Sequence, residues 1–271
     1  MKLISNYHTH TYRCGHAVGE DEEYVLAAIS KGIKILGFSD HISFPGYSFK
    51  GIRQDRNELF DYTNSILNLK EKYKDQIEIH IGFEAEYIKE FVDDYRLLLK
   101  DGGIEYLILG QHCQIVDVKQ AWYNSHHHSE EYLTKYIDDV IEGIKTGLFS
   151  YIAHPDHFMN GYRVWDEFAI KETHRLLKVV ERYQIPLEIN VAGIRFAEHK
   201  HRKNKDGRPI ENLYPFLPFW ELVSQYNIKG IIGVDAHSPN DFLDGVELEA
   251  IAFAKQLNIP LIDHLDFKKI Q

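Results

Sequence analysis

Short apolar runs recur along the chain, and a longer amphipathic segment separates each run from the next. Apolar runs that end at polar residues or glycine predict buried strands. These runs occupy residues 3–7, 33–38, 77–83, 106–109, 149–153, 186–191 and 229–234, with a possible strand stub at 261–262. The segments between them follow a helical period at residues 21–31, 56–73, 90–100, 130–146, 166–183, 216–226 and 247–257.

This alternation of strand and helix predicts an α/β fold with a parallel sheet, because parallel neighbours need a crossover connection, usually a helix. Gly32 and Gly147 lie where two of the helices should end, as C-terminal caps do. The number of strands favours a closed or nearly closed barrel, and no glycine-rich phosphate loop of an open sheet follows any of them. We therefore expect one barrel domain over residues 1–271, with its active site at the carboxyl ends of the strands.

Side chains of metal-ligand type stand where nearly every predicted strand ends. In chain order they are His8, His10 and His16, then Asp40 and His41, Glu84 and Glu86, His112, His154, Asp156 and His157, and finally Asp235 and His237. One buried histidine is more often a hydrogen-bonded core residue than a ligand. That explanation does not account for a series of strands that all end in this way, so we expect these side chains to converge at one rim.

The residue types indicate divalent metal ions. Imidazole and carboxylate together suit zinc, manganese and iron. His8 and His10 share one side of an extended strand, as do Asp235 and His237, because side chains alternate along a strand. Glu84 could bridge two ions through its two oxygens. The set is too large for one ion with about four to six ligands, so we expect two or three ions.

Seven short motifs, in order, resemble the PHP (polymerase and histidinol phosphatase) superfamily. They are HTH at 8–10, CGH at 14–16, GFSDH at 37–41, GFEAEY at 82–87, GQH at 110–112, AHPD at 153–156 and VDAH at 234–237. The chain length, the CGHA at 14–17 and the spacing between QH and AHPD look most like the stand-alone histidinol-phosphate phosphatases.

The resemblance implies a distorted (β/α)7 barrel, similar to a TIM barrel, with a trinuclear metal centre. Transferred by motif position, the ligands of the three ions would be His8, His10, Glu84 and Asp235 for the first, Glu84, His112 and His154 for the second, and His16, His41 and His237 for the third. Asp40 would either bind a metal directly or orient a neighbouring ligand.

The resemblance also implies a phosphomonoesterase of histidine biosynthesis that converts L-histidinol phosphate to L-histidinol and phosphate. A hydroxide shared by two ions would attack the phosphorus, with Asp235, His237 and Glu84 as catalytic residues. Arg195 follows a strand end and Arg163 follows the AHPD loop, and either could bind the phosphate. His157 or Asp156 could protonate the leaving group. The basic segment 195–208 is either a loop that steers an anionic substrate or a solvated surface loop.

Composition narrows the partners. A formal net charge of −10 disfavours nucleic acid and anionic membranes as partners. The chain has two cysteines and no apolar run of signal-peptide or membrane-spanning type, so we expect a cytoplasmic enzyme that acts on a small phosphate ester. The alternatives are a PHP-type phosphatase or nuclease that acts on nucleotides or another ester, and a metal-binding domain without catalysis.

Overall fold

The buried apolar runs form strands of a parallel sheet, since such strands pack on both faces. In the computed structural model, which describes residues 2–116, 119–123, 128–198 and 214–267, seven parallel strands form one sheet in the order β1-β2-β3-β4-β7-β8-β9. They are β1 (Ser5–Asn6), β2 (Ile35–His41), β3 (Glu78–Ala85), β4 (Tyr106–Leu109), β7 (Phe149–Ile152), β8 (Leu187–Asn190) and β9 (Gly230–Gly233).

The first and last strands of the sheet approach one another, so the barrel is nearly closed. Thr9 and Ala236 form an isolated parallel bridge just beyond the ends of β1 and β9. The backbone N–H of His10 donates to the carbonyl of Ala236 at 2.9 Å. Leu261 makes a second bridge, to Gly230, where the strand stub was expected. The predicted seven-stranded α/β barrel is confirmed.

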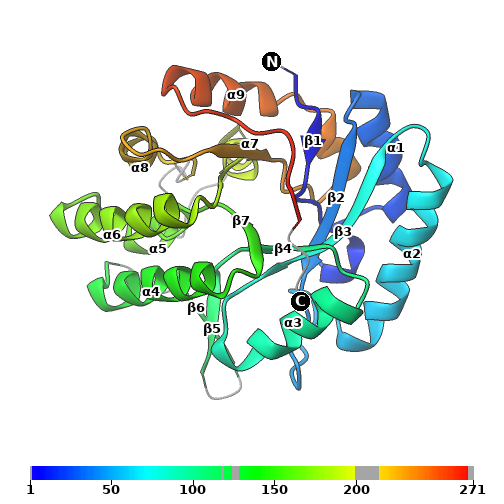
Figure 1. The fold of residues 1–271 in the computed structure, drawn as a ribbon, viewed down its shortest axis with the longest axis horizontal. Coiled ribbons are helices and arrows are strands. Elements are labelled where there is room, and N and C mark those ends of the chain that lie inside the picture. The colour runs from blue at the N-terminus through cyan, green and yellow to red at the C-terminus, as the bar shows by residue number, and fades with distance from the viewer. Residues whose placement is uncertain (1, 117–118, 124–127, 199–213, 268–271) are drawn as a thin grey trace.

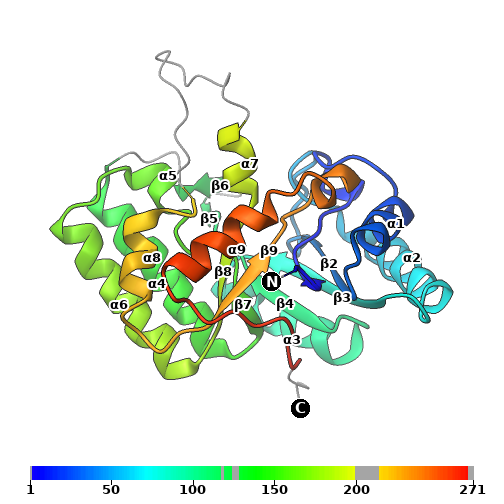
Figure 2. The ribbon, with the colours of Figure 1, turned by 90° about the horizontal axis from the view of Figure 1, so that it is seen from above.

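The helices lie around the outside of the strands (Figures 1 and 2). They are α1 (Asp21–Lys31), α2 (Leu59–Lys72), α3 (Val92–Asp101), α4 (Glu130–Thr146), α5 (Met159–Tyr162), α6 (Glu167–Tyr183), α7 (Ala192–Glu198), α8 (Leu217–Val223) and α9 (Glu247–Gln256). Helices α1 and α4 end at Gly32 and Gly147, both with positive φ, as their C-cap positions predict. Within the described ranges, no helix combines the length and apolar character needed to cross a membrane.

Three elements were not expected from the sequence. An antiparallel hairpin of β5 (Cys113–Val116) and β6 (Lys119–Trp122) follows β4 directly. The short helices α5 and α7 begin soon after the ends of β7 and β8. All three extend from the carboxyl ends of strands, so they build the rim that carries the predicted site.

Aromatic side chains fill the barrel beneath that rim. Tyr106 is buried, and its hydroxyl donates to the carbonyls of Tyr7 and Phe38. Gly37 and Gly82 leave space for its ring, because a Cβ at either position would overlap with it. The C-terminal segment packs on the same ring, where Phe267 stacks at a centroid distance of 5.0 Å. This packing fixes the strands against one another below the site.

Candidate metal centre

A cavity of about 450 Å³ opens at the carboxyl ends of the strands. Its lining includes the following predicted site residues: His16, His41, Glu84, His112, His154, His157, Arg195, Asp235 and His237. His8 and His10 are fully buried and belong to groups of side chains whose ligand atoms converge closely enough to hold a metal ion. The structure therefore brings together most of the residues that the strand-end pattern predicted to converge, with Asp156 as an exception.

The end of β1 delivers two imidazoles to the end of β9. His8 Nε2 lies 3.1 Å from His10 Nε2, and His10 Nε2 lies 3.1 Å from Asp235 Oδ1. Glu84 Oε2 lies 3.3 Å from His8 Nε2 and 3.4 Å from His10 Nε2. Ligand atoms that share a tetrahedral zinc, each about 2.0–2.1 Å from it, stand about 3.3 Å apart. These four side chains have the spacing of a shared ion.

The other oxygen of Glu84 faces a second group. Its Oε1 lies 2.8 Å from His154 Nε2 and 3.3 Å from His112 Nε2, and those two nitrogens are 3.2 Å apart. Glu84 is 1% exposed, so its carboxylate is surrounded by these imidazoles and not by solvent. A carboxylate with ligands on both oxygens is arranged as a bridge between two ions.

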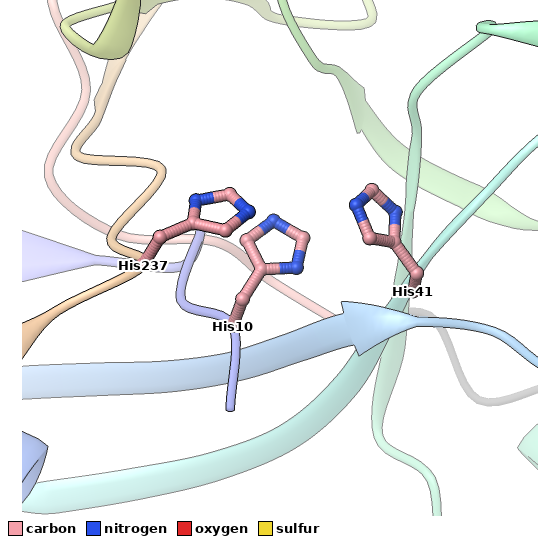
Figure 3. Close-up of side chains that lie close together, drawn as sticks. All are labelled: His10, His41 and His237. Carbon is pink, nitrogen blue, oxygen red and sulfur yellow. The ribbon is translucent and has the colours of Figure 1, made fainter. Parts of the chain in front are cut away.

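A third group lies beside the first. The rings of His10 and His237 are 4.2 Å apart by their centroids, and those of His10 and His41 are 4.3 Å apart. Figure 3 shows these three rings close together; His41 is the last residue of β2, whereas His10 and His237 follow β1 and β9. His16 stands 4.9 Å from His237 and 5.3 Å from His41, again by centroids. His10, His41 and His237 could together hold an ion.

Electrostatics keep the two central carboxyl groups ionised. Burial opposes ionisation of Glu84, but the neighbouring His112, His8 and His41 hold its pKa well below the usual value. The pKa of Asp235 is also held well below its usual value, despite burial, by His8, His10 and His237. Burial and His10 lower the pKa of His237 to about 4, so its imidazole is neutral and offers a lone pair.

Atoms without partners indicate what the cluster is built to hold. Asp235 Oδ1 and His41 Nδ1 are buried and make no hydrogen bond to any described residue, although other ligand atoms surround them. An unsatisfied buried polar atom costs about 1–3 kcal/mol, so such atoms seldom persist without a partner. Ionised carboxylates and imidazoles that converge in this way fit divalent ions that prefer nitrogen and oxygen ligands.

Two further buried side chains orient His112: Glu86, which the strand-end pattern included, and Arg53, which the sequence did not indicate. Its Nδ1 lies 3.1 Å from Glu86 Oε1, and Arg53 Nη2 donates to the same oxygen at 2.9 Å. Arg53 is 2% exposed and stacks on Phe44. Burial raises the pKa of Glu86, but Arg53 and His112 outweigh it and lower the value to about 2. This series of contacts, from Arg53 through Glu86 to His112, thus directs Nε2 of His112 toward Glu84.

Of the residues predicted to contact substrate, the structure brings only His157 and Arg195 to the cavity. His157 is half-buried, and its buried Nδ1 lacks a hydrogen-bond partner among the described residues. Arg195 lies at the rim, where its Nε donates to Asp244 Oδ2 at 2.6 Å. The rest of the basic segment, at 199–208, lies outside the described residues.

Asp156 and Arg163 do not line the cavity, contrary to expectation. Asp156 Oδ2 accepts hydrogen bonds from the backbone N–H of Phe216, at 2.5 Å, and from the indole of Trp220, at 3.1 Å. It anchors the start of α8, and burial raises its pKa to about 7.

Arg163 follows α5 with a φ of 62°, is exposed, and donates to the carbonyl of Asn160. Asp40 is buried, and its Oδ1 accepts from the N–H of His41 at 2.9 Å. Together with His10 and Cys14 it forms another group that could hold an ion.

Gly110 provides the space that the bridging carboxylate occupies, so Gly110→Ala should displace Glu84. A Cβ at this position would overlap with Glu84 Oε1. We expect the free energy of unfolding to fall by about 1–3 kcal/mol, as in overpacked cores, and the metal content to fall as well. Denaturant unfolding and metal analysis measure the two effects. The matched control is Gly230→Ala, whose Cβ would meet side-chain atoms of Ile259, Leu261 and Ile189, at 3.0, 3.1 and 3.7 Å. Full metal content in Gly110→Ala would contradict the bridging role of Glu84.

The family follows from a comparison with known proteins. The family model of the PHP domain matches residues 6–192, which include the strand ends from β1 to β8. The chain belongs to the PHP family. Asp235 and His237 lie beyond the matched segment but complete the same cluster in space.

The names of individual relatives agree with membership of this family. A protein named probable histidinol-phosphatase from Deinococcus radiodurans is 25% identical over 272 residues, which cover 91% of this chain and 93% of the relative. The histidinol-phosphatase of Bacillus subtilis is 32% identical over 103 residues, 35% of this chain and 38% of that protein. The structure of histidinol phosphate phosphatase from Lactococcus lactis, complexed with zinc, L-histidinol and phosphate, superposes with a TM-score of 0.72 at 16% identity, covering 98% of this chain and all of that one. This likeness shows that the PHP fold is shared.

Proposed function

We propose that this PHP-family protein is a metal-dependent phosphomonoesterase that hydrolyses L-histidinol phosphate to L-histidinol and phosphate. The observation that carries the proposal is the complete cluster at the strand ends, in which Glu84 faces one group of imidazoles with each oxygen. The similarity to the Deinococcus radiodurans protein extends over nearly the whole of both chains, and supports histidinol phosphate as the substrate. The zinc, L-histidinol and phosphate of the Lactococcus lactis complex support the same substrate on the same fold.

The residues that would hold the ions are those whose ligand atoms converge. We assign His8, His10, Glu84 and Asp235 to the first ion, and Glu84, His112 and His154 to the second. Motif position assigns His16, His41 and His237 to the third, and their ring centroids lie 4.9–6.4 Å apart. Zinc, manganese and iron all suit this ligand set. When bound, such ions lower the pKa of a bound water and offset the negative charge of a phosphoryl group.

The protein's own side chains place the substrate and manage protons. Asp235 Oδ1, which is unpaired among the described residues, is positioned to accept a proton at the cavity, beside His237 and Glu84. Arg195 retains N–H groups beyond those given to Asp244, Val234 and Asp241, and a guanidinium pairs well with phosphate oxygens. Nδ1 of His157, which also lines the cavity and has no hydrogen-bond partner among the described residues, is available to a ligand.

The net charge and the cysteines support the kind of partner and the cellular location that we propose. With a net charge of −10, the chain is suited to a small phosphate ester and not to nucleic acid or an anionic membrane. Two buried free cysteines are consistent with action in the reducing cytoplasm.

Phosphate release from a substrate panel tests the proposal. Purified protein loaded with zinc or manganese would be given L-histidinol phosphate, nucleoside monophosphates, sugar phosphates and short oligonucleotides. We expect the highest kcat/KM for L-histidinol phosphate. Activity confined to nucleotides or oligonucleotides would overturn the substrate while leaving a PHP-type hydrolase, and loaded protein without any activity would overturn the enzyme itself.

A further inference from the structure

Glu188 is a fully buried carboxylate on β8 that the ligand assignments do not use. Its Oε1 lies 2.8 Å from Nδ1 of His8. The other ring nitrogen of His8, Nε2, faces His10, Glu84 and Asp235 at 3.1–3.4 Å. Glu188 therefore stands behind the imidazole, on the side away from the converging ligand atoms.

The second oxygen of Glu188 holds the backbone of another ligand. Its Oε2 accepts from the backbone N–H of His154 and from Asn190 Nδ2, both at 2.9 Å. Asn190 Nδ2 also donates to Asp235 Oδ2 at 3.1 Å. One carboxylate thus connects the ends of β1, β7 and β9.

Two of these connected residues have a strained backbone. His154 has a φ of 28° and Asp235 a φ of 49°, in the region that side chains other than glycine seldom adopt. Such conformations cost about 1–3 kcal/mol and persist only where surrounding contacts enforce them. The hydrogen bonds of Glu188 and Asn190 are contacts of this kind. Glu188 accepts from the backbone N–H of His154, and Asn190 donates to the side chain of Asp235.

The sheet is also shaped to admit the carboxylate. A Cβ on Gly233, on the neighbouring strand, would overlap with Oε1 of Glu188. A buried charge is costly unless it is paired and hydrogen-bonded, and here His8, Asn190, the N–H of His154 and the more distant Tyr151 hydroxyl, at 3.4 Å, surround it. A purely structural position on a buried strand would be filled more simply by an apolar residue.

We propose that Glu188 is a positioning residue that holds His8 with Nδ1 protonated and Nε2 directed at the metal centre, while it fixes the strand ends that carry His154 and Asp235. The inference rests on the proposed metal-dependent function, because a carboxylate behind a metal-binding histidine orients the ring and increases its basicity as a ligand. Glu188 itself contacts neither metal nor substrate in this account.

Glu188→Gln tests the role, since glutamine has the same size but cannot accept hydrogen bonds on both arms. We expect zinc affinity, measured without substrate by competition with a chelator, to fall by about 10- to 100-fold. With saturating metal, kcat should fall while KM for L-histidinol phosphate changes little. The matched control is Glu172→Gln, which removes another buried carboxylate that pairs with Arg175 on α6. It should bind zinc as tightly as the natural protein.

A second measurement does not require Glu188→Gln to fold, and it uses His8→Asn only to assign the signal. Nitrogen-15 spectra of histidine-labelled, zinc-loaded natural protein should show a protonated Nδ1 for His8, assigned by the signal lost in His8→Asn. A zinc-bound Nδ1 or unchanged affinity in Glu188→Gln would overturn the role of Glu188 alone. Natural protein that binds no zinc would overturn both this role and the proposed function.

Discussion

Glu84→Gln is expected to lower kcat/KM for phosphate release by about three orders of magnitude, the equivalent of about 4 kcal/mol of transition-state stabilisation. The reason is that each oxygen of Glu84 faces a different group of imidazoles, at 2.8–3.4 Å. Glutamine puts an amide N–H donor on one of these two sides, where a metal ion would need an acceptor. Steady-state phosphate release and metal analysis of the purified variant measure the effect.

A control on the same strand separates this effect from damage to the sheet. Glu78 begins β3, and its side chain is 54% exposed, so Glu78→Gln removes the same charge far from the cavity. It should keep full activity and metal content. If Glu84→Gln also kept both, the assignment of Glu84 as the bridging ligand would be wrong.

Removal of divalent metal should destabilise the protein as well as inactivate it. At a free metal concentration of 100 times the dissociation constant, binding raises the free energy of unfolding by about 2.7 kcal/mol per site. A change of 1 kcal/mol shifts Tm by about 2–4 °C in a protein of roughly this size, so each ion lost should lower Tm by about 5–10 °C. The physical source is the set of buried ligand atoms that have no hydrogen-bond partner among the described residues, such as Asp235 Oδ1. Calorimetry with a chelator, and again after zinc or manganese is restored, measures the shift.

The variant Glu84→Gln serves as the control for this stabilisation. Its Tm should respond much less to added metal than that of the natural protein, because it lacks the shared ligand of two ions. An identical Tm with chelator and with saturating metal in the natural protein would show that the cluster does not bind ions with useful affinity.

Much of the barrel could be predicted because its strands are buried on both faces and stand out as apolar runs between helices. The helices at 21–31 and 130–146 have the predicted ends. The hairpin of β5 and β6 was missed because CQIV and KQAW are short and follow Gln111 and His112 without a turn signal. Short helices such as α5 have too few residues to show a period.

The candidate site was predictable to the extent that it depends on position in the chain. A residue at the end of a parallel strand must lie at the rim, which places His8, Glu84 and His154 together whatever the details of the loops. Asp156 also follows a strand end, but its side chain accepts a hydrogen bond from Trp220, which is distant in sequence. Such a contact depends on tertiary packing, which the local pattern does not contain.

The supporting residues were missed for a related reason. Arg53 lies in a loop with no strand or motif to mark it, and its partner Glu86 is 33 positions away. Glu188 does leave a signal, since a glutamate inside the apolar run PLEINV stands two residues before Asn190 and so on the same face of the strand. A charged residue on the inward face of a buried strand is a feature to weigh beside residues at strand ends.

The most direct test of the metal centre is anomalous diffraction at the zinc edge from crystals of the natural protein saturated with zinc. We expect two or three anomalous peaks within the cluster, one of them between Glu84 and the pair His112 and His154, and another among His8, His10 and Asp235. Zinc-saturated crystals with no peak among these side chains would contradict it.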